Sequence, residues 1–226
     1  CSNNLDGLVK VNLTCEKIDA LYQPKLKATP NDKALITLVL KLYDMRKCNN
    51  NPNYLPLVEK SFEMEPNAQA AEMLGNNYRK LKNADKMILY FEKAAELSTD
   101  NTKKEEYYII LADAYVNKSP SQSRVYANKA LDINPNNGKA MIYIGMAIYK
   151  TACGDKFDKA MHACISLDYF NRAKNADPSV AALANKNIAT YSKYVPLKSD
   201  AFFRNLKNGD SYTIPCSGLT ATVKTR

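Results

Sequence analysis

The sequence predicts an all-α solenoid, or superhelix, in which about four helical hairpins stack between helical caps, followed by a short C-terminal β-hairpin-like tail. The first observation is a pair of amphipathic helices in residues 67–97, with near copies before and after it. The second is a proline that recurs at the ends of these copies, at Pro66, Pro135 and Pro178. The first two prolines lie about two periods of ~34 residues apart, and the last two lie one period plus roughly nine residues apart.

The clearest hairpin shows how its two helices pack. Leu74, Gly75 and Tyr78 share one face of the first helix, and Phe91 and Ala94 share one face of the second. The glycine and the alanine are small enough to let the helices approach closely. We therefore expect the larger side chains to fill the space between the helices.

Three further hairpins repeat this alternation of large and small residues, because one hairpin cannot bury both of its faces alone. The next copy has Ala127 where the clearest hairpin has Phe91, so we expect large neighbours such as Tyr126 to fill the space. The last copy carries an insert around residues 151–162, and a degenerate first copy has Ser61 where alanine is usual. The defining positions are Tyr108, Leu111, Ala112, Tyr115 and Ala130 in the second clear copy, and Ile144, Gly145, Ile148, Phe170 and Ala173 in the third.

These patterns divide the chain into four segments. We expect an N-terminal cap in residues 1–30, the hairpins in residues 31–178, a capping helix in residues 179–199 and a docked tail in residues 200–226. The cap should contain one helix around Thr14–Leu21, followed by extended chain.

The tail loses the helical period and gains threonine, tyrosine and valine. Ser211–Ile214 and Leu219–Lys224 are predicted to be two short strands, with a frayed tail as the alternative. An isolated two-stranded hairpin is marginally stable in water, so it should dock on the helices, with Phe202 and Phe203 as the expected apolar anchor.

The residue types and the period resemble the tetratricopeptide repeat (TPR). A narrower resemblance rests on NPNNGKAMIYIGMAIY, the cysteine-containing insert, FFRNL and the ending GDSYTI…TATVKTR. These segments are similar to secreted TPR proteins of Bacteroidetes that lack an assigned activity. The resemblance implies a fold and an extracytoplasmic location more than an activity.

Composition narrows the classes of partner. With 226 residues and 46% apolar content, the chain can form a sizeable core, and no apolar run approaches the ~18 residues of a membrane span. The formal net charge of +9 favours an acidic partner or surface. Nucleic acid is disfavoured, because the lysines are scattered along polar helix faces and no nucleic-acid motif is present.

Six cysteines and a single histidine make a Cys/His zinc site improbable, since no CxxC pair occurs. We expect a Cys153–Cys164 disulfide across the insert and a Cys15–Cys48 disulfide between the cap and the first hairpin. Buried thiols in a cytosolic protein are the alternative. Cys1 could instead carry a lipid, as the first residue of a mature bacterial lipoprotein does, and the pairing of Cys1 and Cys216 is left open.

No constellation of catalytic residues is visible. Any Ser/His/Asp or Cys/His site would have to use His162, which we interpret as a partly exposed residue in a loop or at a helix start. No phosphate-binding glycine motif is present, and the carboxylates are scattered on polar faces. The sequence therefore predicts a protein that is not an enzyme and that uses no cofactor, metal or small-molecule substrate.

What remains is binding through the first helices of the hairpins, which line the concave side of such a solenoid. A TPR carboxylate clamp is disfavoured, because Glu72 replaces the expected lysine and Ile110 and Tyr143 occupy other clamp positions, although Asn76 matches. The predicted peptide-binding residues are Asn76, Arg79, Lys80, Asp113, Asn117, Lys139, Tyr143, Met146, Tyr149 and Lys150. The wider lining adds Gln69, Glu72, Glu106, Ile109 and Ile142.

The sequence thus favours a non-catalytic protein–protein interaction module that binds an acidic peptide or protein, outside the cytoplasm of a bacterium. The first alternative is a structural or assembly subunit at the outer membrane, attached to the membrane only if Cys1 is lipidated. The second is a cytosolic basic adaptor.

Overall fold

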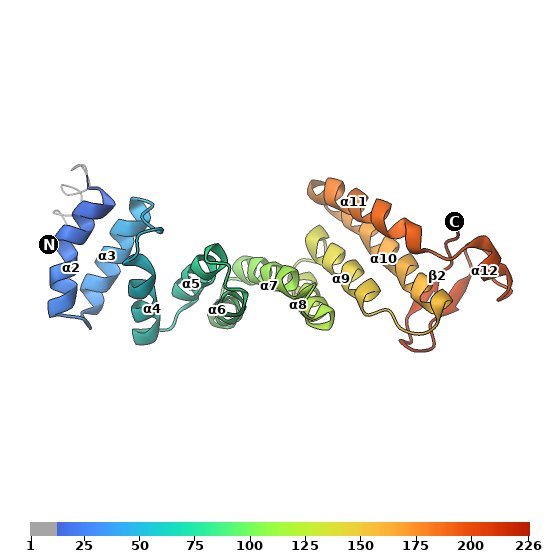
Figure 1. Ribbon diagram of the computed structural model, residues 1–226, viewed down its shortest axis with the longest axis horizontal. Helices are drawn as coiled ribbons and strands as arrows, with labels where there is room; N and C mark the ends of the chain where they lie inside the picture. Colours follow the sequence, from blue (N-terminus) through green and yellow to red (C-terminus); the bar gives the residue numbers. More distant parts are fainter. Residues whose placement is uncertain (1–12) are drawn as a thin grey trace. The chain divides into compact units, whose positions relative to one another are not determined.

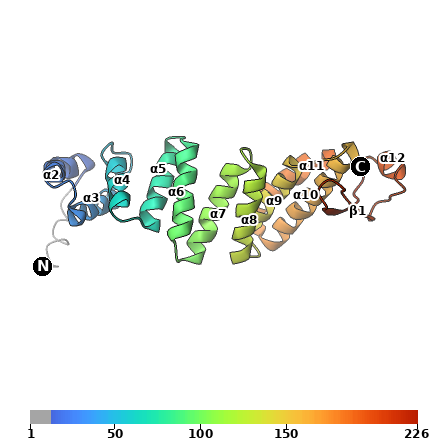
Figure 2. The same ribbon diagram turned by 90° about the horizontal axis from the view of Figure 1, so that it is seen from below.

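A computed structural model describes residues 13–226, which divide into two compact units with the boundary in the sequence between Ser98 and Thr99. The predictions about Cys1, and about part of the N-terminal cap, concern residues outside the described range. Each unit consists of helices that pack in consecutive pairs (Figures 1 and 2).

The N-terminal unit contains five described helices, and α5 lies along α6 (Figure 2). Asparagine side chains begin two of these helices: Asn67 accepts a hydrogen bond from the Ala70 amide at 2.9 Å, and Asn83 accepts one from the Lys86 amide at 3.1 Å. The helices are α2 (Cys15–Ala28), α3 (Lys33–Met45), α4 (Tyr54–Met64), α5 (Ala68–Lys80) and α6 (Ala84–Leu97).

The C-terminal unit contains the remaining elements, with α7 along α8 and α9 along α10. The α-helices are α7 (Asn101–Tyr115), α8 (Pro120–Ile133), α9 (Gly138–Lys150), α10 (Lys156–Ala176), α11 (Ala181–Tyr191) and α12 (Lys198–Phe202). Two short 3₁₀ helices, η1 (Pro178–Val180) and η2 (Ser192–Tyr194), flank α11. Strands β1 (Ser211–Thr213) and β2 (Thr220–Thr222) pair antiparallel, with Tyr212 opposite Ala221.

Large and small side chains interlock between paired helices, as the sequence predicts. A Cβ atom built on Gly75 would lie 2.9 Å from the ring of Phe91, and one built on Gly145 would lie 2.7 Å from the ring of Phe170. Both separations are too short for real atoms, so glycine is what admits each ring. In the α7–α8 hairpin, Tyr126 stacks with Tyr108 and Tyr115 at ring-centroid distances of 6.2 and 5.6 Å, which confirms that tyrosines fill the space there.

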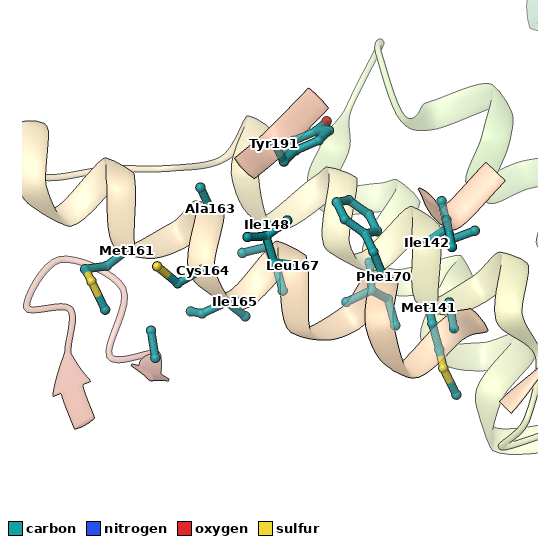
Figure 3. Close-up of a cluster of buried hydrophobic side chains, with 14 of the residues drawn as sticks. Met141, Ile142, Ile148, Met161, Ala163, Cys164, Ile165, Leu167, Phe170 and Tyr191 are labelled. Atoms are coloured by element: carbon teal, nitrogen blue, oxygen red, sulfur yellow. The ribbon is translucent and has the colours of Figure 1, made fainter. Parts of the chain in front are cut away.

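The core of the C-terminal unit centres on α9 and α10 (Figure 3). Phe170 is fully buried, and its ring lies 5.1 Å from that of Tyr191, measured between centroids. Figure 3 draws Ile148 and Leu167 in the same cluster of buried side chains. The tail adds Ile214 to the same core.

Two predictions about helices are wrong. Helix α2 continues past Leu21 to Ala28 with Pro24 inside it, at an exposed position. Most of the insert is helical, because α10 begins at Lys156. His162 is therefore buried inside a helix and not partly exposed.

The cysteines pair differently from the prediction at one site. Cys15–Cys48 is present, but Cys153 bonds Cys216 and not Cys164. Cys164 points into the core from α10, while the tail brings Cys216 next to the loop that precedes α10. Burial raises the pKa of the Cys164 thiol, whose Sγ lies 3.6 Å from the Lys224 carbonyl oxygen.

The tail docks through residues other than the predicted anchor. Ile214, Ala221 and Val223 are buried, whereas Phe202 and Phe203 are 75% and 83% exposed. The predicted apolar anchor is therefore wrong, since α12 turns both phenylalanines toward solvent.

Candidate functional site

The N-terminal unit contains an open cavity of about 560 Å³ between α3, α4 and α5. Seven of its fifteen lining residues are apolar, and three of these are methionines, Met45, Met64 and Met73. Methionine is flexible and polarizable, so a methionine-lined cavity can adapt to apolar side chains of different shapes. The other lining residues are Lys33, Ile36, Thr37, Leu40, Lys41, Asp44, Val58, Ser61, Glu65, Asn67, Gln69 and Ala70.

Residue size explains why this hairpin stays open. By position in the repeat, Leu40 stands where α5 has Gly75, and Val58 stands where α6 has Phe91. The first helix thus carries a larger side chain than glycine at this position, and the second helix carries an aliphatic side chain in place of an aromatic ring. Leu40 and Val58 border the cavity from beneath, since they are themselves buried, at 8% and 0% exposed. Ser61 also lines it, at the position where the other hairpins carry buried alanines.

Charged groups of both signs surround the cavity. Lys33 forms an ion pair with Glu65 between exposed side chains, and Lys41 also lines the cavity. Asp44 accepts a hydrogen bond from the Tyr54 hydroxyl at 2.7 Å. Burial and this neighbouring carboxylate raise the pKa of Tyr54 well above its ordinary value, so the hydroxyl stays protonated and holds Asp44 in place.

The residues predicted on α5 continue from this cavity. Gln69 and Met73 line it, and Asn76 and Lys80 follow at helical spacings that place all four on one face of α5. Arg79 lies beside this stripe: its guanidinium donates to the Asn76 side-chain oxygen and sits 5.7 Å from the centroid of the Phe91 ring. The α5 part of the predicted set therefore shares a surface with an observed cavity.

The C-terminal unit brings together two of its predicted residues. The Tyr143 hydroxyl of α9 donates a hydrogen bond to Asp113 of α7 at 2.9 Å. Burial and this carboxylate raise the pKa of Tyr143, so the phenol remains a donor at neutral pH. Lys139, Met146 and Lys150 share the Tyr143 face of α9 by helical spacing. Asn117 is exposed just beyond the end of α7.

Other predicted positions do not lie on that face. Ile142 is 1% exposed and belongs to the core, so its predicted place in the lining is wrong. Ile109 packs against the same core. Tyr149 is six residues from Tyr143 and points to another side of α9, where its ring lies 4.9 Å from Tyr191 and 5.1 Å from Tyr194 between centroids.

Tyr149 instead lines a second cavity, of about 460 Å³, in the C-terminal unit. Four basic residues, Lys156, Lys159, Lys193 and Arg226, and two acidic residues, Asp155 and Asp200, also line it. Sequence reasoning did not locate this cavity, because its walls come from α9, α10 and η2 and from residues near the end of the chain. The excess of basic residues after Lys186 was the one signal available.

The buried polar groups of α10 act structurally. The Asp158 side chain accepts from the Tyr212 hydroxyl at 2.7 Å, and Nδ1 of His162 lies 2.8 Å from the Asp158 carbonyl oxygen. Ser166 donates to the Gly145 carbonyl oxygen at 2.7 Å. Gly154 turns the chain into this helix with φ +80°, where a side chain would meet Asp158. Within residues 13–226, no three His, Cys, Asp or Glu side chains are grouped so that they could hold a metal ion.

Solved structures with a similar fold were found. A crystal structure of YrrB, described as a TPR protein with an unusual peptide-binding site, covers 77% of this chain and 83% of its own, with 19% identity and a TM-score of 0.55. A crystal structure of the MamA protein covers 74% of this chain and 84% of its own, with 22% identity and a TM-score of 0.52. A second MamA structure covers 74% and 92%, with 20% identity and a TM-score of 0.52.

The chain has a TPR-like fold. No protein-family model matches the sequence, and no curated protein matches it. In TPR terms, α3, α5, α7 and α9 are the first helices of successive repeats, and α4, α6, α8 and α10 are the second helices. The methionine-lined cavity thus lies between the first helices of the first two repeats and the second helix that joins them. None of the helices described in residues 13–226 is long and apolar enough to cross a membrane.

Proposed function

We propose that the protein is a non-catalytic interaction module that binds an extended peptide segment of a partner protein along the first helices of its repeats. The observation that carries this proposal is the open, methionine-lined cavity between α3 and α5. One apolar side chain of the peptide enters the cavity and displaces water from its apolar lining. The peptide-binding site of YrrB, a protein of similar fold, supports a peptide as the class of partner.

The charges beyond the cavity favour acidic residues on one side of that apolar side chain. The cavity lining is balanced, with Lys33 and Lys41 beside Asp44 and Glu65, whereas Arg79 and Lys80 lie farther along α5. The whole chain carries a net charge of +9, which attracts acidic segments over longer distances and speeds association. In the C-terminal unit, Lys139, Tyr143 and the other predicted residues of α7 and α9 form a second proposed contact surface, with Asp113 holding the Tyr143 ring in place.

A selection of short random peptides displayed on phage tests this proposal. We expect enriched peptides to contain a large apolar residue next to Asp or Glu. In fluorescence anisotropy, Met73→Glu should raise the Kd of a selected peptide by at least about tenfold, because it places a charge in an apolar cavity. Leu89→Glu is the matched control, because Leu89 is 45% exposed on α6 and does not line the cavity.

Two outcomes would contradict the proposal that a peptide binds in this cavity. Either no peptide is enriched, or Leu89→Glu weakens binding as much as Met73→Glu does. Enrichment of basic peptides would contradict only the acidic character of the partner. Far-UV circular dichroism of each variant verifies that the helices are intact.

We further propose that the protein works outside the cytoplasm. Two disulfides support this location, since such bonds persist in oxidising compartments and are rare in the cytosol of most organisms. Fractionation of the native cell tests it: the oxidised protein should appear with the envelope or the medium, and a fully reduced cytosolic pool would contradict it.

A further inference from the structure

The C-terminal unit displays an apolar patch at α12 that the peptide groove does not use. Phe202 and Phe203 are 75% and 83% exposed, the highest values of any large apolar side chain in residues 13–226. Tyr194 and Leu197, just before α12, are 48% and 37% exposed. These four residues are called the aromatic patch below. Figure 1 shows α12 at the outer edge of the C-terminal unit.

The patch is held by ordered contacts. Ala201 is buried, and its carbonyl oxygen accepts from the Leu206 amide at 3.0 Å. Arg204 forms an ion pair with Asp155 of α10 and lies 4.7 Å from the centroid of the Phe157 ring. These contacts fix the segment on both sides of the two phenylalanines, so the rings face solvent because the fold places them there.

Basic residues outnumber acidic ones in the segment that carries the patch. Residues 193–210 contain four basic residues, Lys193, Lys198, Arg204 and Lys207, and two acidic ones. The second cavity adjoins the patch, since Tyr194 and Leu197 also line it, and its four basic residues outnumber its two carboxylates. Exposed aromatic rings within a basic rim match the two layers of an anionic membrane surface, with apolar chains beneath negatively charged headgroups.

We propose that the aromatic patch binds the surface of an anionic lipid bilayer. Phe202 and Phe203 insert their rings at the boundary between headgroups and acyl chains, and the surrounding lysines contact the lipid phosphates. A protein partner is the less favoured occupant, because the adjacent rings project from a short turn and a protein would need a matching hollow, whereas a fluid bilayer opens around them. The proposal requires neither a lipid on Cys1 nor the peptide groove.

Vesicle sedimentation tests the proposal with the unlipidated full chain. Vesicles of phosphatidylcholine with phosphatidylglycerol should retain the protein, and vesicles of phosphatidylcholine alone should retain far less. The double variant Phe202→Ser with Phe203→Ser should lower the partition coefficient by about tenfold or more, since it removes most of the inserted apolar surface. The control is Leu89→Ser with Leu183→Ser, two exposed apolar residues on α6 and α11.

A spectroscopic probe measures insertion directly. The chain contains no tryptophan, so Phe203→Trp introduces a single tryptophan at the patch, which can be excited selectively beside the fifteen tyrosines. Its emission should shift to shorter wavelength with anionic vesicles and should be quenched by lipids brominated on their acyl chains. Lys198→Gln with Lys207→Gln should weaken binding to anionic vesicles, because it removes charge from the rim.

The proposal is overturned if the wild-type chain does not bind anionic vesicles, or if the double serine variant binds them as well as the wild type does. It is also overturned if the wild type ignores vesicles but sediments as a dimer that the double serine variant abolishes. In that case the patch would be a contact between two copies of the chain.

Discussion

The α3–α4 hairpin and the α9–α10 hairpin use the same repeat pattern with opposite results. In α9–α10, Gly145 admits the ring of Phe170, and the interface is filled. In α3–α4, Leu40 and Val58 occupy the corresponding positions, and a cavity of about 560 Å³ remains beside them. A large ring opposite a glycine seals a hairpin, whereas two middle-sized aliphatic side chains leave it open.

This difference connects residue size to function. The helical period is present in both hairpins, so periodicity alone decides that helices form but not whether they enclose space. The glycine–phenylalanine pair fills the α9–α10 interface, and tyrosines fill the α7–α8 interface, which lacks the pair. The α3–α4 hairpin borders a cavity that can accept a side chain from a partner.

Removing the Phe170 ring from the sealed hairpin should lower the free energy of unfolding far more than shortening Val58 in the open hairpin. Phe170→Ala should lower the free energy of unfolding by about 4 kcal/mol, because the ring is fully buried against Gly145 and Tyr191. Val58→Ala should cost about 1–2 kcal/mol, since Val58 already borders a cavity. Urea unfolding followed by circular dichroism measures both, and equal costs would contradict the distinction between the hairpins.

The disulfide of the C-terminal unit should stabilise the sealed region. Cys153→Ser with Cys216→Ser should cost about 3 kcal/mol, because the bond closes a long loop in the unfolded chain. Peptide mapping of the oxidised protein should recover Cys153 linked to Cys216, and Cys164→Ala should leave this link intact. Recovery of a peptide that joins Cys153 to Cys164 would contradict the observed pairing.

Adding a methyl group should lower the stability of the sealed hairpin more than that of the open hairpin. Gly145→Ala should cost about 2 kcal/mol, because the new Cβ would lie 2.7 Å from the Phe170 ring. Val58→Ile should cost less, about 1 kcal/mol, because Val58 is itself fully buried but lies beside the cavity, into which its neighbours can shift. Thermal unfolding distinguishes the two, and a tolerated Gly145→Ala would show that the sealed hairpin has spare room.

Acid should weaken the N-terminal unit through Asp19. Burial acts to raise the pKa of Asp19, but hydrogen bonds from Tyr43 and Asn51 outweigh it and leave the pKa below its ordinary value. A lowered folded-state pKa gives stability that is present above the unfolded-state pKa and is lost as the pH falls through the folded-state pKa. Asp19→Asn should therefore make the melting temperature fall less steeply as the pH is lowered. The difference should correspond to less than about 1 kcal/mol, because solvent screens the group. An unchanged slope would contradict this role.

The sequence predicts most of the helical hairpins because the signals are local. Helix caps such as Asn67 and Asn83 and the interlock of Gly75 with Phe91 depend on residues close along the chain or within one repeat. The β-hairpin follows in the same way from its turn and strand residues.

What sequence reasoning missed depends on contacts between distant segments. The partner of Cys153 could not be identified from spacing, because Cys216 arrives through a tail that docks on α10. The exposure of Phe202 and Phe203 follows from the anchoring of Ala201 and Arg204, which apolar composition alone does not reveal. The methionine-lined cavity lies beside Leu40 and Val58, which replace the glycine and phenylalanine of other hairpins. Matching the sequence to the repeat pattern does not reveal what such a replacement does to the packing.

The most direct test of the open first hairpin is carbon-13 methyl NMR of the methionines during titration with a selected peptide. The chain has seven methionines, and Met45, Met64 and Met73 line the cavity, whereas Met141 and Met161 are buried in the core of the C-terminal unit. We expect saturable shifts of the three cavity methyl groups, with the two core methyl groups unchanged. Binding of the peptide with no shift at any of the three would contradict the claim that this cavity receives the partner.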